Sequence, residues 1–176
     1  NLNVSYESKE GSIDALKNID LEIRKGEIIA IVGETGSGKT SLGRALLNIN
    51  PKNAQTTFDE IIINHGEQYS LTESEELNNL RGSVISMLFQ EPTIYLNPSM
   101  KCGLQILEAI LLDGKDDKKT AKHKILISLS SIGFDDPERI YKSFPNQLSE
   151  GECQRVMLVM STIRNPNLLI ADEPSS

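Results

Sequence analysis

Tryptophan is absent from this 176-residue sequence, and cysteine and histidine occur only twice each. Cys102 and Cys153 lie far apart and form no CxxC pattern or Cys/His cluster, which argues against a zinc site and against a disulfide framework. Two isolated thiols fit a reducing cytoplasm. We expect His65 and His123 to be solvated side chains, since both lie in polar segments.

Positive charge and long apolar runs are also scarce. The formal net charge is −7 and no basic stripe occurs, which argues against a non-specific nucleic-acid binder. No run approaches the roughly 18 apolar residues of a membrane span, and the first residues form no signal region. Any membrane role would therefore come through a partner.

A glycine-rich segment carries the first functional signal. Residues 33–40, GETGSGKT, match the phosphate-binding pattern G-x-x-x-x-G-K-[ST] at every fixed position. The apolar run 28–32 before it predicts a buried parallel strand, and the apolar spacing over 42–49 after it predicts a helix. A chance match is expected on the order of once in a hundred chains of this length, before that context is required. Strand, loop and helix together predict a nucleoside triphosphate site.

The chemistry of such a loop assigns roles to its residues. Glycines let the backbone N–H groups face inward, and the positive end of the following helix favours a polyphosphate anion. Lys39 is expected to reach the β- and γ-phosphates and the Thr40 hydroxyl to ligate Mg²⁺. The predicted ATP-binding residues here are Gly33, Glu34, Thr35, Gly36, Ser37, Gly38, Lys39, Thr40 and Ser41.

The remaining pattern predicts an α/β chain with an antiparallel β lobe, a mostly parallel core sheet and an inserted helical subdomain. Period-two alternation predicts antiparallel strands over 2–6 and 19–23 around a polar turn at 7–12. The other expected elements are an irregular stretch over 50–57, strands over 58–64, 83–89 and 168–171, a helix over 72–80 opened by a Thr72/Glu75 capping box, helices between 100 and 148, and a helix ending near 165. We expect the nucleotide-binding core over 1–99, the helical subdomain over 100–148, and the return to the core over 149–176.

Polar residues that could take part in catalysis follow two further predicted strands. Asp172 and Glu173 follow the apolar run 168–171, where an Asp can hold Mg²⁺, usually through water, and the next acid can orient or deprotonate the attacking water. Alone, the pair could simply mark a strand leaving the core. Gln90 follows the strand over 83–89 and could bind a metal-bound water, although a surface glutamine is the commoner explanation.

Residues 147–156, QLSEGECQRV, complete a family resemblance. They resemble the L-S-G-G-Q signature of ATP-binding-cassette (ABC) ATPases, whose order of phosphate loop, Gln loop, signature and acidic strand is repeated here. Residues 87–92, MLFQEP, with 95–98, YLNP, and 169–174, LIADEP, look like the ATPase subunits of oligopeptide, dipeptide and nickel importers. The similarity covers nearly the whole chain, and Leu-Asn-Pro is its more discriminating element.

That resemblance implies further roles. Tyr6 would stack on adenine, with a half-buried strand aromatic as the alternative; Gln90 would link nucleotide to permease, and Glu173 would be the general base. Mg²⁺ would be held by Thr40, Gln90 and Asp172. Family members work as dimers, so Ser149 and Gly151 would meet the γ-phosphate of ATP bound by the partner.

The implied partners are transmembrane permease subunits, a second ABC ATPase subunit, identical or different, and indirectly an extracytoplasmic solute-binding protein. The implied location is cytoplasmic, peripheral on the inner face of the membrane. The alternatives are a degenerate cassette that binds ATP and dimerises but hydrolyses it poorly, and a soluble ABC ATPase that acts on nucleic acid.

Two acids depart from the family signature. Glu150 replaces its first Gly, and Glu152 replaces its Gln. As a Ser149-x-x-Glu152 capping box, acids in the first turn would gain about 0.3–1 kcal/mol. A carboxylate about 6 Å from a phosphate charge would instead cost roughly 3 kcal/mol per pair at an effective dielectric near 20. The direction of the side chains decides between stabilised helix and attenuated hydrolysis.

The sequence stops at Ser176, before the family's Asp-containing loop and switch His. We therefore expect a C-terminally incomplete cassette, and negligible ATPase activity from residues 1–176 alone.

Overall fold

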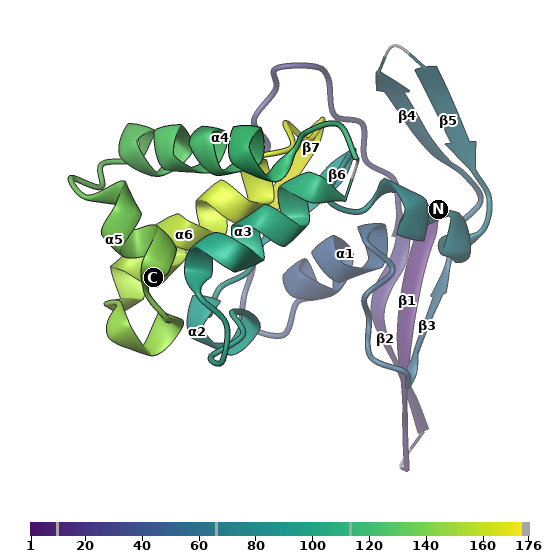
Figure 1. The fold of residues 1–176 in the computed structure, drawn as a ribbon. Helices are drawn as coiled ribbons and strands as arrows, with labels where there is room; N and C mark the ends of the chain where they lie inside the picture. The colour runs from purple at the N-terminus through teal and green to yellow at the C-terminus, as the bar shows by residue number, and fades with distance from the viewer. Residues whose placement is uncertain (10, 66, 113, 174–176) are drawn as a thin grey trace. The chain divides into compact units, whose positions relative to one another are not determined.

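The computed structural model describes residues 1–9, 11–65, 67–112 and 114–173 (Figure 1). The chain divides into two compact units, Asn1–Arg81 and Gly82–Ser176. The boundary falls at a different place from the predicted end of the core at residue 99, and the three-part division remains a prediction.

The first unit is built on a three-stranded antiparallel sheet in the order β2-β1-β3. Its elements are β1 (Leu2–Ser8), β2 (Gly11–Ile19), α1 (Lys39–Leu46), β3 (Ala54–Thr57), β4 (Ile61–His65), β5 (Glu67–Leu71) and a 3₁₀ helix (Ser74–Leu80). Leu2 and Val4 alternate into a small core with Leu16 of β2 and with Leu42 and Ala45 of α1. The period-two prediction for the first strand is confirmed, and its buried face seats the helix that follows the glycine loop.

Two predictions around this sheet were wrong. The return strand runs over Gly11–Ile19 rather than 19–23, because Ser8 pairs directly with Gly11 and the chain turns back at once. Leu21 and Ile23 lie beyond it and are 48% and 40% exposed. The stretch expected to be irregular contains β3, which pairs with β1 through residues 3–6. Its polar side chains hide this from a hydrophobic pattern, whereas the open edge of β1 supplies the ladder that makes it a strand.

The apolar run 28–32 is not a strand in the structure, contrary to expectation. Ile28 and Val32 are 97% and 89% exposed. β-propensity describes how well a side chain fits a half-buried pleated surface, and the strand itself exists only where a neighbour completes the ladder. Among the residues that the structure describes, no strand pairs with this segment.

The rest of the first unit contains a hairpin and a short helix. β4 pairs with β5, a strand that the sequence analysis did not predict. The capping box is displaced by one residue from the predicted Thr72/Glu75, since the helix begins at Ser74 and Glu76 occupies its third position. The Glu76 carboxylate accepts from the backbone N–H groups of Thr72 at 2.9 Å and Glu73 at 3.1 Å. The side chain of His65 lies outside the described residues.

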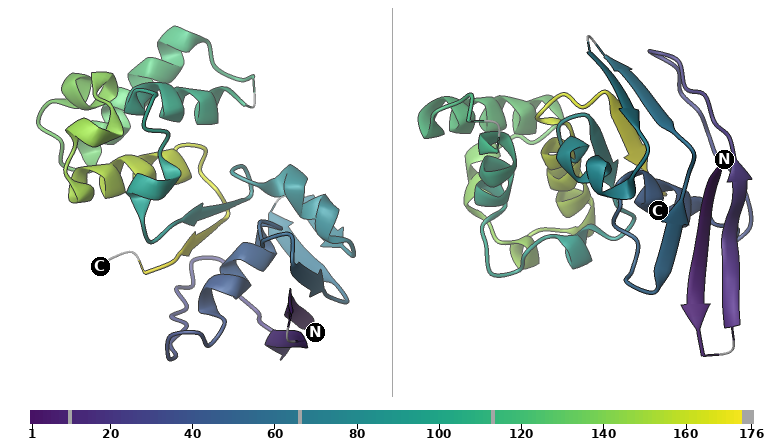
Figure 2. Two further views of the ribbon diagram at one scale, coloured as in Figure 1. Left: turned by 90° about the horizontal axis from the view of Figure 1, so that it is seen from below. Right: turned by 90° about the vertical axis from the view of Figure 1, so that its right-hand side faces the viewer.

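The second unit joins a parallel strand pair to a cluster of helices. Its elements are β6 (Ile85–Leu88), α2 (Pro92–Tyr95), α3 (Cys102–Leu111), α4 (Lys118–Ser131), α5 (Pro137–Lys142), a 3₁₀ turn (Pro145–Gln147), α6 (Glu150–Thr162) and β7 (Leu168–Ala171). Helices α3 to α6 stay together in both views of Figure 2, and the β6–β7 pair extends from that cluster. The predicted helical block and the strand over 168–171 are confirmed.

Both cysteines lie in the core of this helical cluster. Cys102 and Cys153 are free and fully buried among aliphatic side chains, and burial raises the pKa of the Cys102 thiol to about 12.

His123 is exposed on α4, as predicted. The described residues contain no cluster of three or more His, Cys, Asp or Glu side chains suited to a metal ion. None of their helices is long and apolar enough to cross a membrane.

Candidate functional site

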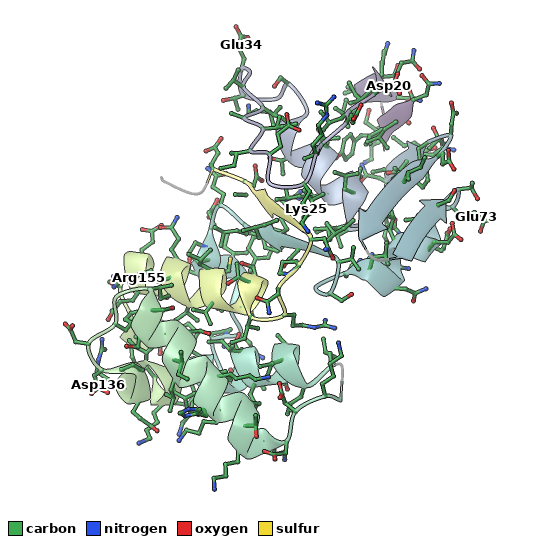
Figure 3. All side chains as sticks on the ribbon, turned by 90° about the horizontal axis from the view of Figure 1, so that it is seen from above. Asp20, Lys25, Glu34, Glu73, Asp136 and Arg155 are labelled. Atoms are coloured by element: carbon green, nitrogen blue, oxygen red, sulfur yellow. The ribbon has the colours of Figure 1, made fainter. Side chains whose placement is uncertain are left out.

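The glycine loop of the first unit closes around its own lysine. Lys39 opens α1, and its ammonium donates to the carbonyl oxygens of Gly33 at 2.8 Å and Glu34 at 2.9 Å. The Ser37 N–H donates to the Glu34 carbonyl at 3.1 Å and completes the turn. Figure 3 shows Glu34 at the outer end of the loop with its side chain pointing outward. The one cationic side chain of the predicted loop is therefore folded back over the backbone that a phosphate would meet.

Gly38 is required by both conformation and space. Its φ is +94°, and a Cβ atom there would lie 2.6 Å from the Ala15 carbonyl oxygen and 2.8 Å from Leu16 Cδ2. Gly36 also has a positive φ, +84°, but a Cβ atom there would meet nothing within 4 Å. The loop therefore depends on Gly38 for its packing against β2, while Gly36 supplies only conformational freedom.

We predict that Gly38→Ala destabilises the first unit more than Gly36→Ala does. Each change forces an L-residue to a positive φ at about 1–2 kcal/mol. Gly38→Ala adds overlap with the β2 backbone, which we expect to cost about 1–3 kcal/mol more. Urea denaturation of both variants measures the difference in the free energy of unfolding. Equal losses would show that the loop is not packed against Ala15 as described.

Tyr6 is held beside the same helix. Its hydroxyl shares a hydrogen bond with Ser41 Oγ at 2.8 Å and donates to Asn50 Oδ1 at 3.5 Å. Its half-buried ring packs against the core of the first unit. The side chain is thus a strand aromatic with a satisfied hydroxyl, and stacking on adenine stays a prediction.

In the second unit, the ends of two strands bring the predicted catalytic residues together. β6 and β7 are parallel and in register up to Leu88 and Ala171, so their carboxyl ends coincide. The Asp172 N–H extends the ladder to the Leu88 carbonyl at 3.0 Å. Two residues beyond β6, Gln90 Nε2 donates to Glu173 Oε2 at 2.7 Å. Residues 83 apart in sequence therefore share one polar site at the sheet end, where α/β proteins place their ligands.

The chemistry of this site suits water activation. Glu173 is exposed, and the Gln90 amide holds one of its carboxylate oxygens, which fixes the side chain and leaves the other oxygen accessible. A fixed, accessible carboxylate can take a proton from a water molecule. Within this unit, Gln90 and Asp172 offer amide and carboxylate oxygens, which are donors of the kind that Mg²⁺ accepts alongside waters and substrate phosphates. The chemistry of these two residues suits the predicted ion, and a Mg²⁺ site that also includes Thr40 stays a prediction.

The signature region opens α6 with a reciprocal cap. Ser149 Oγ accepts from the Glu152 N–H at 3.3 Å, and Glu152 Oε2 accepts from Ser149 N at 2.9 Å and Ser149 Oγ at 3.1 Å. The capping-box reading of Ser149 and Glu152 is confirmed. The Ser149 N–H and then Arg139 hold the pKa of the Glu152 carboxyl below its usual range. Gly151 is exposed in the same turn.

The structure adds two residues that the sequence analysis did not single out. Gln105 is buried on α3; its amide donates to the carbonyls of Asn97 at 3.0 Å and Met100 at 2.9 Å and accepts from Asn97 N at 2.9 Å. It therefore fixes the Leu-Asn-Pro segment. Arg139 of α5 forms an ion pair with Glu152. No local motif marks either residue, because the contacts join residues between five and 13 positions apart.

Comparison with known families decides the identity of this arrangement. The model of the ABC transporter family matches residues 16–176. This chain belongs to the ABC transporter family. It is an ATP-binding domain of that family. The resemblance predicted from the glycine loop, the Gln90 segment, the signature and the acidic strand is therefore confirmed.

Curated relatives place this ABC cassette near the peptide-transport branch. It is 36% identical over 176 residues to the dipeptide transport ATP-binding protein DppD of Bacillus subtilis, covering 100% of the chain and 52% of that protein. It is 39% identical over 162 residues to the oligopeptide transport ATP-binding protein OppD of Lactococcus lactis subsp. cremoris, covering 92% of the chain and 48% of that protein. The chain thus spans about half the length of the curated relatives it matches.

Solved structures confirm the cassette fold. The chain superimposes with a TM-score of 0.76 and 25% identity on the ATP-binding cassette MJ0796, in a dimeric post-hydrolysis state bound to ADP and Pi, covering 99% of this chain and 74% of that one. A second dimeric structure of MJ0796 gives the same TM-score at 26% identity, covering 98% and 74% of the two chains. The predicted α/β phosphate-loop class is therefore correct, even though the run 28–32 is not paired as a strand.

Proposed function

We propose that this cassette binds and hydrolyses ATP to energise an importer of oligopeptides, dipeptides or similar small solutes. The observation that carries the hydrolytic part is the Gln90–Glu173 hydrogen bond at the common end of β6 and β7. It orients a carboxylate toward solvent beside Asp172, as proton abstraction from an attacking water requires. The similarity to DppD and OppD supports the peptide-import part.

The phosphate-binding role falls to the glycine loop. In the described conformation Lys39 spends its hydrogen bonds on two carbonyl oxygens. A polyphosphate would offer charged acceptors in their place, and charge-assisted hydrogen bonds are stronger than those to neutral carbonyls. Loop N–H groups and the N-terminus of α1 would hold the same anion. Mg²⁺, when bound, would offset phosphate charge.

The composite site of the proposed function requires two cassettes. Ser149 and Gly151 of one cassette would face ATP held by the glycine loop of the other. The dimeric state of MJ0796 supports this arrangement. Permease subunits in the membrane would receive the motion, with Gln90 as the link. Such a cassette would work on the cytoplasmic face of the membrane.

Steady-state phosphate release by the complete protein tests this function, with and without its permease subunits. We expect hydrolysis that the permease stimulates. ATP-dependent dimerisation with no hydrolysis would favour a degenerate cassette. Hydrolysis stimulated by nucleic acid and unaffected by the permease would favour a non-transport ABC ATPase.

The alternative of a degenerate cassette, which binds ATP but hydrolyses it poorly, rests on Glu150. It is exposed in the first turn of α6, and among the described residues its side chain has no hydrogen-bond or ion-pair partner. An uncompensated carboxylate near the partner's γ-phosphate would cost roughly 3 kcal/mol at about 6 Å and an effective dielectric near 20.

We therefore predict that Glu150→Gly raises phosphate release by the assembled transporter by about tenfold or more, because it removes this repulsion. Phosphate release and thermal unfolding are measured on the same preparation. Unchanged turnover with a lower melting temperature would show that Glu150 serves only the helix start.

A further inference from the structure

The two acids in the first turn of α6 have different surroundings. The side chain of Glu152 is 19% exposed, with one oxygen bonded to Ser149 and the other paired with the Arg139 guanidinium. Glu150 is exposed and unpaired within the described part of the chain. The same turn therefore contains one compensated carboxylate and one bare carboxylate.

The compensating cation comes from a neighbouring helix. Arg139 lies on α5, where its backbone N–H donates to the capping Asp136 carboxylate at 2.9 Å. Figure 3 labels Asp136 at the start of α5 and Arg155 on α6. The Arg155 guanidinium lies over the Phe134 ring, 4.4 Å from its centroid. This leaves Arg139 as the cation paired with Glu152.

Two lysines close to Arg139 pair with a different carboxylate. Lys122 and Lys142 both pair with Glu138, at 2.9 and 3.2 Å. Neither therefore substitutes for Arg139 in the described contacts.

Glu152 carries a full charge at neutral pH. Its pKa lies below the usual range because the Ser149 N–H, and then Arg139, stabilise the ionised form. The hydroxyl of Ser149 donates to that charged carboxylate. The Glu152 carboxylate is therefore held at both oxygens, by Ser149 at Oε2 and by Arg139 at Oε1.

We propose that Arg139 is a positioning residue of the signature, which neutralises Glu152 and fixes it on Ser149 so that an acid at position 152 does not repel the ATP bound by the partner cassette. This inference rests on the proposed function, since it assumes a composite ATP site. Arg139 of α5 would then be the residue that allows an acid at position 152 in the signature. Glu150 would remain the acid of this turn whose charge is not neutralised.

The proposal predicts an unusual relation between two substitutions. Arg139→Ala leaves Glu152 bare, which should weaken ATP-dependent dimerisation because like charges across an interface are unfavourable. Adding Glu152→Gln removes the bare charge and should restore dimerisation. If Arg139 only braced α5 against α6, the second substitution would not restore what the first had removed.

The experiment measures the dimer dissociation constant at saturating ATP by sedimentation velocity. It uses the complete protein carrying Glu173→Gln to prevent turnover, alone or mixed with the second cassette of its transporter. We expect Arg139→Ala to raise the constant about tenfold. Arg139→Lys should recover part of that loss, and Arg139→Ala/Glu152→Gln should return to within about threefold of the parent.

Two controls accompany the series. Lys142→Ala removes an exposed i,i+4 ion pair from the same short helix and should leave the constant unchanged, since such pairs contribute little. ATP titration of dilute monomer reports the cassette's own glycine loop, and it should be the same for all variants. Thermal unfolding of each variant monitors the fold.

The outcomes separate the inference from the proposed function. A dimerising parent whose Arg139→Ala and double variants are equally weakened, or equally unaffected, overturns the role of Arg139 alone. A parent that binds ATP as a monomer but forms no dimer with either cassette overturns the composite site, and the inference with it.

Discussion

Lys39→Ala is expected to weaken ATP binding by on the order of 100-fold or more, since hydrogen bonds to charged groups contribute about 1.5–3 kcal/mol each and Lys39 would make at least two to the phosphates. A smaller effect opposes this loss, because ATP has to displace the ammonium from the Gly33 and Glu34 carbonyls and the variant has no such bonds to break. Calorimetric titration with Mg-ATP measures the dissociation constant.

Lys52→Ala is the matched control for this titration. Lys52 is an exposed lysine of the same unit, in the turn before β3, and lies outside the glycine loop. Its replacement changes the net charge equally and should leave the affinity unchanged. An affinity of the Lys39→Ala protein within a fewfold of the parent would refute the phosphate-loop assignment.

Glu173→Gln should keep ATP binding and reduce turnover by about 10²–10⁴-fold, the usual contribution of a general base. The amide is nearly isosteric and can still accept the Gln90 hydrogen bond through its oxygen, but it cannot take a proton from water. ATP-bound dimers should accumulate because hydrolysis no longer separates them. Single-turnover phosphate release and gel filtration with ATP check both parts.

Gln90→Leu distinguishes the base from its support. This change removes the donor to Glu173 but leaves the carboxylate. We expect a smaller loss of turnover than for Glu173→Gln, because a mobile base still samples the productive position. Wild-type turnover in the Glu173→Gln protein would show that another group is the base.

Local sequence patterns predict short-range contacts better than they predict strand pairing. The pattern over 33–40 marks the glycine loop, and the spacing of Ser149 and Glu152 allows a helix cap, whose side-chain direction only the structure gives. The sequence places Gln90 and Glu173 only after two separate predicted strands and does not predict that they meet. The parallel register of β6 and β7 brings the two side chains into contact.

Failures of prediction have a common cause. The apolar run 28–32 has the composition of a buried strand, yet no described strand pairs with it. The polar segment that became β3 lacks that composition, but it lies along the open edge of β1. In both cases pairing, which depends on distant residues, outweighs local propensity. Arg139 and Gln105 were missed for the same reason, since their partners are set by tertiary packing.

We propose above that ATP hydrolysis by this cassette drives solute import. Uptake of a labelled dipeptide into vesicles tests it most directly, with the complete protein reconstituted with its permease, second cassette and solute-binding protein. We expect uptake that requires ATP on the cassette side and is lost with Glu173→Gln. Vigorous ATP hydrolysis by the same vesicles without uptake of any dipeptide or oligopeptide would contradict it.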